Sequence, residues 1–257
     1  MSAPAALPPA GPSRSGVLDG AATVVVLVGL WQALHAYAGD AAIASPLAAF
    51  RHLAGLAATA GFWSHAGATF TAFAAALAIS AGLGIGLGLV LGLRRFAGEV
   101  AEPILAGLYA IPKVTLYPVI LLIFGLGLGA KVAFGVIHGV IPITLFTLTA
   151  VKGISPVLIR TARAMRLSQP ETIRTILAPA VLPEIVTGLR VGFSLTLLGV
   201  LVGEMFASQK GLGFLIVNGI NLHNVQQTTA VILMLVIVAV AANGGLLWLD
   251  RRWFHRA

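Results

Sequence analysis

Residues 67–93 read GATFTAFAAALAISAGLGIGLGLVLGL, and no charged side chain interrupts them before Arg94 and Arg95. A helix needs about 20 mostly apolar residues to cross the hydrocarbon core of a bilayer. The alternation of glycine with larger residues also resembles a barrel strand, but this uninterrupted length is that of a helix. The stretch therefore predicts a transmembrane helix.

Glycine recurs through the second half of this stretch and produces three overlapping G-x-x-x-G spacings. The glycines concerned are Gly82, Gly84, Gly86, Gly88 and Gly92. In lipid, such spacing allows two helix backbones to approach closely. We expect this helix to pack tightly against a neighbouring span.

The composition extends the membrane prediction to the whole chain. Of 257 residues, 58% are apolar and only 9% are charged, whereas soluble domains carry roughly 25% charged residues. The absence of cysteine excludes disulfides, thiolate metal sites and cysteine nucleophiles. The net charge of +8 does not indicate nucleic acid as a partner, because membrane proteins retain Lys and Arg on their cytoplasmic side.

The chain is predicted to be an all-α membrane protein with about six transmembrane helices. The spans expected are residues 21–38, 67–93, 104–126, 131–151, 188–207 and 229–249. They define a transmembrane domain over 21–252, with a cytoplasmic loop over 152–187 between the fourth and fifth spans. Residues 1–20 are predicted to be a disordered cytoplasmic tail, and residues 253–257 a second cytoplasmic tail.

The distribution of basic residues orients these spans. With both termini in the cytoplasm, twelve of the sixteen Lys and Arg residues lie on that side. Arg51, Lys131 and Lys210 lie on the opposite side, and Lys113 falls inside the third span. This bias predicts a multi-pass protein with its N- and C-termini inside.

Polar residues within the spans are candidates for a translocation path. Lys113 follows Pro112, and prolines kink helices that often line cavities. An intramembrane charge suggests function, but Lys113 could equally snorkel to the interface. Glu204, near the outer end of the fifth span, could pair with a neighbouring helix or line a gate. The residues tentatively assigned to a substrate pathway are Tyr109, Lys113, Tyr117 and Glu204.

The loop over 152–187 has a helical pattern of its own. Arg160, Arg163 and Arg166 share one helical arc, opposite a more apolar one, so this is an amphipathic helix. Ser168 and Glu171 have the spacing of a capping box and predict a second helix to about residue 177, before two prolines break it. The residues alone leave two interpretations open, a lipid-contacting element or a docking element for a soluble partner.

Several stretches of this chain resemble one family of membrane proteins. The stretch Arg160-Thr-Ala-Arg-Ala-Met-Arg-Leu-Ser168, with Pro179-Ala-Val-Leu-Pro183 after it, resembles the EAA loop of bacterial ATP-binding-cassette (ABC) importer permeases. Ala110-Ile-Pro112 and Phe124-Gly-Leu-Gly127 look like the nitrate/sulfonate/taurine branch. Three further motifs with the same resemblance are Thr187-Gly-Leu-Arg190, Gly203-Glu-Met-Phe206 and Gly211-Leu-Gly-Phe-Leu215.

The resemblance implies a fold, a set of partners and a cellular location. Such permeases insert a coupling helix into a separate ABC ATPase, which binds the ATP, so no cofactor is expected in this chain. A periplasmic or extracellular solute-binding protein delivers the solute, and a second permease subunit, in the simplest case a homodimer, completes the path in the bacterial cytoplasmic (inner) membrane. The residues implied in ATPase coupling are Arg160, Thr161, Ala162, Arg163, Met165, Arg166, Leu167, Ser168 and Glu171.

Two positions depart from the family pattern. Arg160 replaces the glutamate of the EAA motif, and Arg166 replaces its glycine, which puts the shape of the turn in doubt. We expect an ATPase with acidic residues facing both arginines.

The chain has no G-x-x-x-x-G-K-[ST] loop and no other catalytic motif, so an enzyme is not expected. The expected solute is a small anion such as nitrate, a sulfonate or taurine. The alternative is a stand-alone secondary transporter or channel, which would need intramembrane charge pairs or matching broken helices.

Overall fold

The computed structural model describes residues 14–254, which form helices and contain no strand. Five helices in this range are long and apolar enough to cross a membrane. They are α1 (Arg14–Ala38), α3 (Ala60–Leu93), α6 (Leu128–Lys152), α9 (Ala178–Ala207) and α11 (Val225–Phe254). A bent helix pair is apolar enough to cross only if its two parts count as one span, which gives five to six crossings, so the predicted all-α membrane fold is confirmed.

The bent pair replaces the continuous third span expected over 104–126. Helix α4 (Arg95–Ala110) and the segment formed by η1 (Lys113–Leu116) and α5 (Tyr117–Phe124) meet at 84°. Ile111 has an extended conformation because a residue before proline is displaced from the α region. Pro118 lies in the first turn of α5, where its missing N–H costs nothing. Pro112 therefore ends a helix and Pro118 starts one.

Helices α3, α6 and α9 form the centre of the bundle, and glycines bring them together. On α3, a Cβ built at Gly84 would lie 2.7 Å from the Cβ of Ile143 on α6. Gly88 and Gly92 face Thr147 and Val151 of α6 in the same way. The close packing predicted from the G-x-x-x-G spacings is therefore confirmed on this face.

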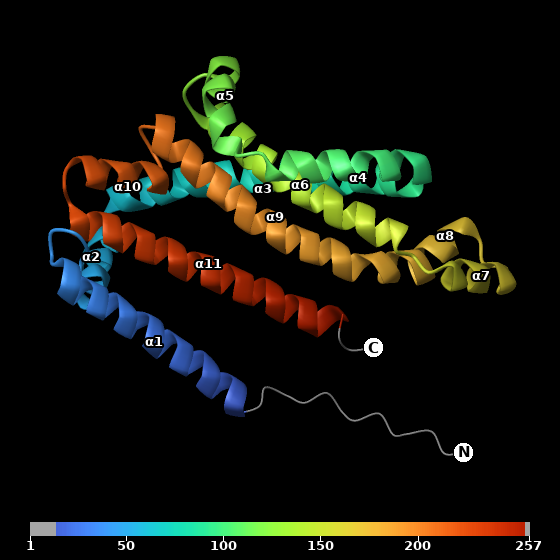
Figure 1. Ribbon diagram of the computed structural model, residues 1–257, viewed down its shortest axis with the longest axis horizontal. Coiled ribbons are helices and arrows are strands. Elements are labelled where there is room, and N and C mark those ends of the chain that lie inside the picture. Colours follow the sequence, from blue (N-terminus) through green and yellow to red (C-terminus); the bar gives the residue numbers. More distant parts are fainter. Residues whose placement is uncertain (1–13, 255–257) are drawn as a thin grey trace.

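Two short helices were not predicted, and both contribute to packing at one end of the bundle. They are α2 (Pro46–Ala57) and α10 (Leu212–Asn221). Phe62 of α3, Ile216 of α10 and Val231 of α11 form a buried apolar cluster there. Figure 1 shows α2 and α10 at the opposite end of the molecule from α7 (Pro156–Ala164) and α8 (Gln169–Thr172).

The helix ends differ from the predicted tails. Residues 14–20, expected to be disordered, form the first turns of α1, and residues 253–254 belong to α11. The remaining tail positions, 1–13 and 255–257, lie outside the described residues. In Figure 1 the start of α1 and the end of α11 point toward the same end of the molecule as α7 and α8.

Candidate functional site

Helix α7 ends in a compact turn centred on Arg166. The N–H of Leu167 donates to the carbonyl of Ala162, and the N–H of Arg166 donates to the carbonyl of Arg163. This pair of bonds is a Schellman motif. Arg166 takes a φ of 52°, the left-handed conformation that glycine adopts most easily. The turn is therefore formed although arginine stands where the family pattern has glycine.

Arg166→Gly is expected to stabilise the turn by about 0.5–1 kcal/mol, because glycine removes a left-handed strain of roughly 1–2 kcal/mol but loses more chain entropy. Arg163→Gly makes the same chemical change at a helical position of α7, and it should destabilise by up to about 1 kcal/mol. Hydrogen exchange of the Leu167 amide measures both effects. Arg166→Ala, which removes the charge but keeps a Cβ, should not gain protection; equal gains for alanine and glycine would contradict the explanation.

Helix α8 starts with the predicted capping box. The backbone N–H and the hydroxyl of Ser168 donate to Glu171 Oε2 at 2.8 and 2.6 Å. The hydroxyl bond and then the backbone bond lower the pKa of Glu171 below its ordinary value, since both stabilise the carboxylate. This carboxylate stays charged at neutral pH, and its two bonds to Ser168 hold the start of α8 after the turn.

The second helix of the loop does not stop near residue 177, so that prediction was wrong. A π-helical turn, η2 (Ile173–Leu177), joins α8 to α9, and one helical run extends from Gln169 to Phe206. The N–H of Ala178 donates to the carbonyl of Ile173, five residues back. Pro179 follows directly after this π-helical turn. Proline has no backbone N–H to donate, and the regular i to i−4 hydrogen bonds of the helix are already interrupted here, so proline disturbs them least. Pro183 lies inside α9 without ending it.

The surface of α7 combines charge with exposed apolar side chains. Arg160, Arg163 and Arg166 are exposed, and no ion pair of theirs with a carboxylate occurs among residues 14–254. Val157 and Met165 keep 59% and 64% of their surface accessible, while Ala162 is buried. The described part of the chain thus leaves the predicted apolar arc uncovered, which is typical of a surface that meets a partner or lipid.

A second polar site is buried at the other end of the bundle. Glu204 of α9 is completely buried and pairs with Lys131 of α6 at 3.3 Å. Its other oxygen accepts from the Thr69 hydroxyl of α3 at 2.8 Å and from the N–H of Gly213 at 3.0 Å. Since Gly213 lies in the first turn of α10, the carboxylate also meets the positive end of that helix.

This cluster also holds the chain between α9 and α10. Lys131 donates to the carbonyl of Lys210, and Thr69 accepts from the N–H of Leu212 at 2.8 Å. A Cβ at Gly211 would overlap the Glu204 carboxylate. Sequence analysis placed Lys131 among the outer residues and recognised only Lys113 as an intramembrane base. The structure adds that Lys131, in the first turn of α6, is a buried base paired with Glu204.

The other pathway candidates separate into buried and accessible residues. Tyr117 is buried, and its hydroxyl donates to the Gly203 carbonyl at 2.6 Å, so it joins α5 to α9. Tyr109 remains 43% exposed at the end of α4. Lys113, at the break after α4, donates to the Tyr109 carbonyl at 3.0 Å, and its ammonium lies 5.0 Å from the centre of the Tyr109 ring.

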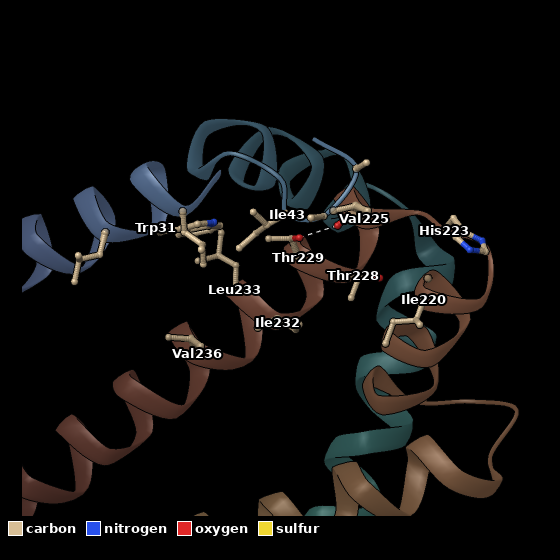
Figure 2. A pocket seen from close by; sticks show the side chains of 15 residues that line it. Trp31, Ile43, Ile220, His223, Val225, Thr228, Thr229, Ile232, Leu233 and Val236 are labelled. Atoms are coloured by element: carbon tan, nitrogen blue, oxygen red, sulfur yellow. Dashed lines mark hydrogen bonds between the residues drawn. The ribbon is translucent and has the colours of Figure 1, made fainter. Parts of the chain in front are cut away.

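Three cavities accompany these sites. One of about 740 Å³ lies between α1, the turn after it, and α11. Figure 2 shows Trp31 and Ile43 facing Thr229 and Leu233 of α11 across it, with His223 set apart. Its walls are mostly apolar, so its size does not indicate a polar solute site. A second, of about 690 Å³, opens beside Lys131 and Lys210; a third, of about 370 Å³, contains Tyr109 and Arg190.

The fold and the site together define a multi-pass helical membrane protein with an exposed hairpin between two of its long helices. Residues 80–255, more than half of the chain, match the family described as binding-protein-dependent transport system inner membrane component. The chain belongs to this family of ABC transporter permeases, so the family resemblance seen in the sequence is confirmed.

Individual relatives differ in the solute that their names give. A riboflavin transport permease of Chloroflexus aurantiacus is 32% identical over 48% of this chain and 46% of its own length. A formylaminopyrimidine transport permease of Halalkalibacterium halodurans is 30% identical over 44% and 45%. The taurine transport permease of Escherichia coli is 26% identical over 60% and 56%. The chain thus spans about half the length of these relatives.

Proposed function

We propose that this chain is the transmembrane permease subunit of an ABC importer, moving a small solute that a solute-binding protein delivers. The observation that carries the proposal is the α7–α8 hairpin, which is built by a Schellman turn and a capping box and presents three unpaired arginines. Lipid contact does not require so defined a turn. A separate ABC ATPase, which binds the ATP, would receive this hairpin.

The helical run from Gln169 to Phe206 offers a direct mechanical connection. It starts in the hairpin and carries Glu204 at its other end, about 50 Å away at 1.5 Å per residue. When the ATPase subunits close on ATP, a displacement of the hairpin would tilt this helix as a unit. The buried Glu204–Lys131 pair would transmit the tilt to α6, and the core would alternate between inward and outward openings.

The proposed assembly is a pair of permease subunits in the bacterial cytoplasmic membrane, with both termini in the cytoplasm. If the hairpin lies in the cytoplasm, its arginines are on the side of the membrane where the distribution of Lys and Arg predicts them. Lys131 and Arg190 lie within the bundle and no longer count toward either side, but the remaining excess still favours this orientation. A two-fold homodimer is the simplest assembly.

For the solute we propose a small anion, such as a sulfonate, taurine or nitrate. Two relatives of this chain are named as aliphatic sulfonate permeases and one as a taurine permease. Lys113, beside the accessible ring of Tyr109, would attract an anion. The names of the riboflavin and formylaminopyrimidine permeases make uncharged heterocycles the competing class.

Charge reversal at the hairpin tests the coupling proposal. Arg160→Glu with Arg166→Glu is expected to lower recovery of the ATPase with the permease by about tenfold or more, because each arginine would face an acidic group. Arg94→Glu is the matched control, an exposed arginine at the same end of the bundle, and it should assemble normally. Co-purification and ATP hydrolysis stimulated by the binding protein in liposomes measure the outcome; unchanged assembly of the double variant would refute the docking role of these arginines.

A stand-alone transporter remains the competing class. One feature expected of it, an intramembrane charge pair, is present in Lys131 and Glu204. However, both side chains are buried, and their polar atoms are bonded to each other and to Thr69, Gly213 and the Lys210 carbonyl, so little of the pair is available to a ligand. Solute uptake by this chain in liposomes without an ATPase would overturn the importer proposal.

A further inference from the structure

The cavity of about 370 Å³ opens at the surface of the bundle, between the end of α4 and residues of α9 and α11, and its lining residues Tyr109, Ser194 and Asn243 are exposed. Its lining consists of Tyr109, Thr187, Arg190, Val191, Ser194, Leu195 and Asn243. Arg190 is fourteen residues before Glu204 on α9, or about 21 Å along the helix axis. Tyr109 is seven residues, or about 10 Å, beyond Glu102, which pairs with Lys152 at the hairpin end of α6. Tyr109 therefore lies toward the hairpin end of the bundle, and Arg190 lies between the hairpin and Glu204 on the helical run from Gln169 to Phe206.

Among the side chains that the structure describes, no carboxylate neutralises Arg190. Its Nε is buried without a hydrogen-bond acceptor, and its nearest polar contact is Asn243 Oδ1, at 3.5 Å from a terminal nitrogen. Within residues 14–254, neither Arg190 nor Lys113 forms an ion pair with a carboxylate. Arg190 as a whole is half-buried, but a buried guanidinium nitrogen normally finds an acceptor, because an unsatisfied polar group in low dielectric is costly.

The other groups around the cavity can complete an anion site. Ser194 and Asn243 supply hydroxyl and amide groups, and the Tyr109 ring covers one side. Lys113 adds a second positive charge 5.0 Å from that ring. A guanidinium binds two oxygens of a carboxylate or sulfonate side by side. The volume is in the range of small-molecule pockets.

We propose that this cavity binds the oxyanion group of the transported solute, a sulfonate or carboxylate, with Arg190 as its main ligand. The proposal rests on the importer function and adds an inner binding site to it. The apolar cavity of Figure 2 offers no comparable charge. In the cavity beside Lys131, Glu204 already neutralises that base, and the second base, Lys210, is exposed to solvent.

The test is binding of radiolabelled ethanesulfonate to the full chain in phosphatidylcholine nanodiscs. Arg190→Gln is expected to weaken binding by about 10- to 100-fold, the range of a charged hydrogen-bonded pair, and Arg190→Lys by less. Arg51→Gln, which removes an exposed arginine of α2, should bind as the unmodified chain does. Uncharged ethanesulfonamide should bind weakly to all of them. Equal binding of ethanesulfonate to the unmodified chain and to Arg190→Gln, or no binding to either, overturns the proposal.

A lipid headgroup could supply the same oxyanion chemistry, and a second arm separates the two sources. In nanodiscs that contain phosphatidylglycerol, a solute site keeps its ethanesulfonate affinity. If phosphatidylglycerol instead competes, and co-purifies with the unmodified chain but not with Arg190→Gln, the cavity is a lipid site and the solute assignment fails. Because this assay needs no ATPase, its result is independent of the hairpin experiment, where failure would count against the importer function itself.

Discussion

Glu204→Ala is expected to lower the free energy of unfolding by about 3–5 kcal/mol, the cost of leaving a buried charge without its partner. In the variant, Lys131 stays buried with only the Lys210 carbonyl beside it. Thr69 and the N–H of Gly213 lose their acceptor as well. Thermal or denaturant unfolding of the purified protein in detergent micelles measures the change.

The double variant Lys131→Met with Glu204→Leu distinguishes a structural pair from simple loss of packing. Removing both charges leaves apolar groups of similar size, which in other proteins is often close to neutral. We therefore expect the double variant to unfold at higher denaturant concentration than Glu204→Ala. Lys131→Met and Glu204→Leu are also measured singly. If the loss of unfolding free energy in the double variant equals the sum of the losses in these two single variants, the charges are not coupled.

The sequence was sufficient for the helical class and for the five long spans, because both depend on the length of apolar segments. The angle within the third crossing was not predictable. Pro112 indicates a break, but the 84° turn depends on where α5 packs, and Tyr117 holds it by bonding Gly203 of α9. Helix α10 was missed as well, since its ten residues are too few for a span and pack only within the assembled bundle.

The two polar sites differ in how local they are. In the hairpin, the capping box joins residues three apart, so Ser168 and Glu171 were identified correctly from spacing alone. Lys131 and Glu204 are 73 residues apart, and Thr69 is 135 from Glu204. Nothing in the sequence around Lys131 distinguishes a buried base from an interfacial one. Only the close approach of α3, α6 and α9 brings these groups together.

That close approach leads to the second large expected effect, Gly88→Leu. A Cβ at Gly88 would overlap Thr147 and lie 2.8 Å from the carbonyl oxygen of Thr144, both on α6. Neither atom can rotate away, since one belongs to the stem of a β-branched side chain and the other to the backbone. The helices must separate, and we expect a loss of about 3 kcal/mol or more, at the upper end for overpacking.

Gly86→Leu is the matched control, because it makes the same change two residues away on α3, where a Cβ would meet nothing within 4 Å. Leucine there should be neutral or stabilising by up to about 1 kcal/mol, since it forms helix better than glycine. Unfolding in detergent compares the two variants directly. Equal losses of unfolding free energy in the two variants would mean that glycine acts on this helix through its flexibility. A loss in Gly88→Leu alone would show that one face of α3 is in direct backbone contact with α6.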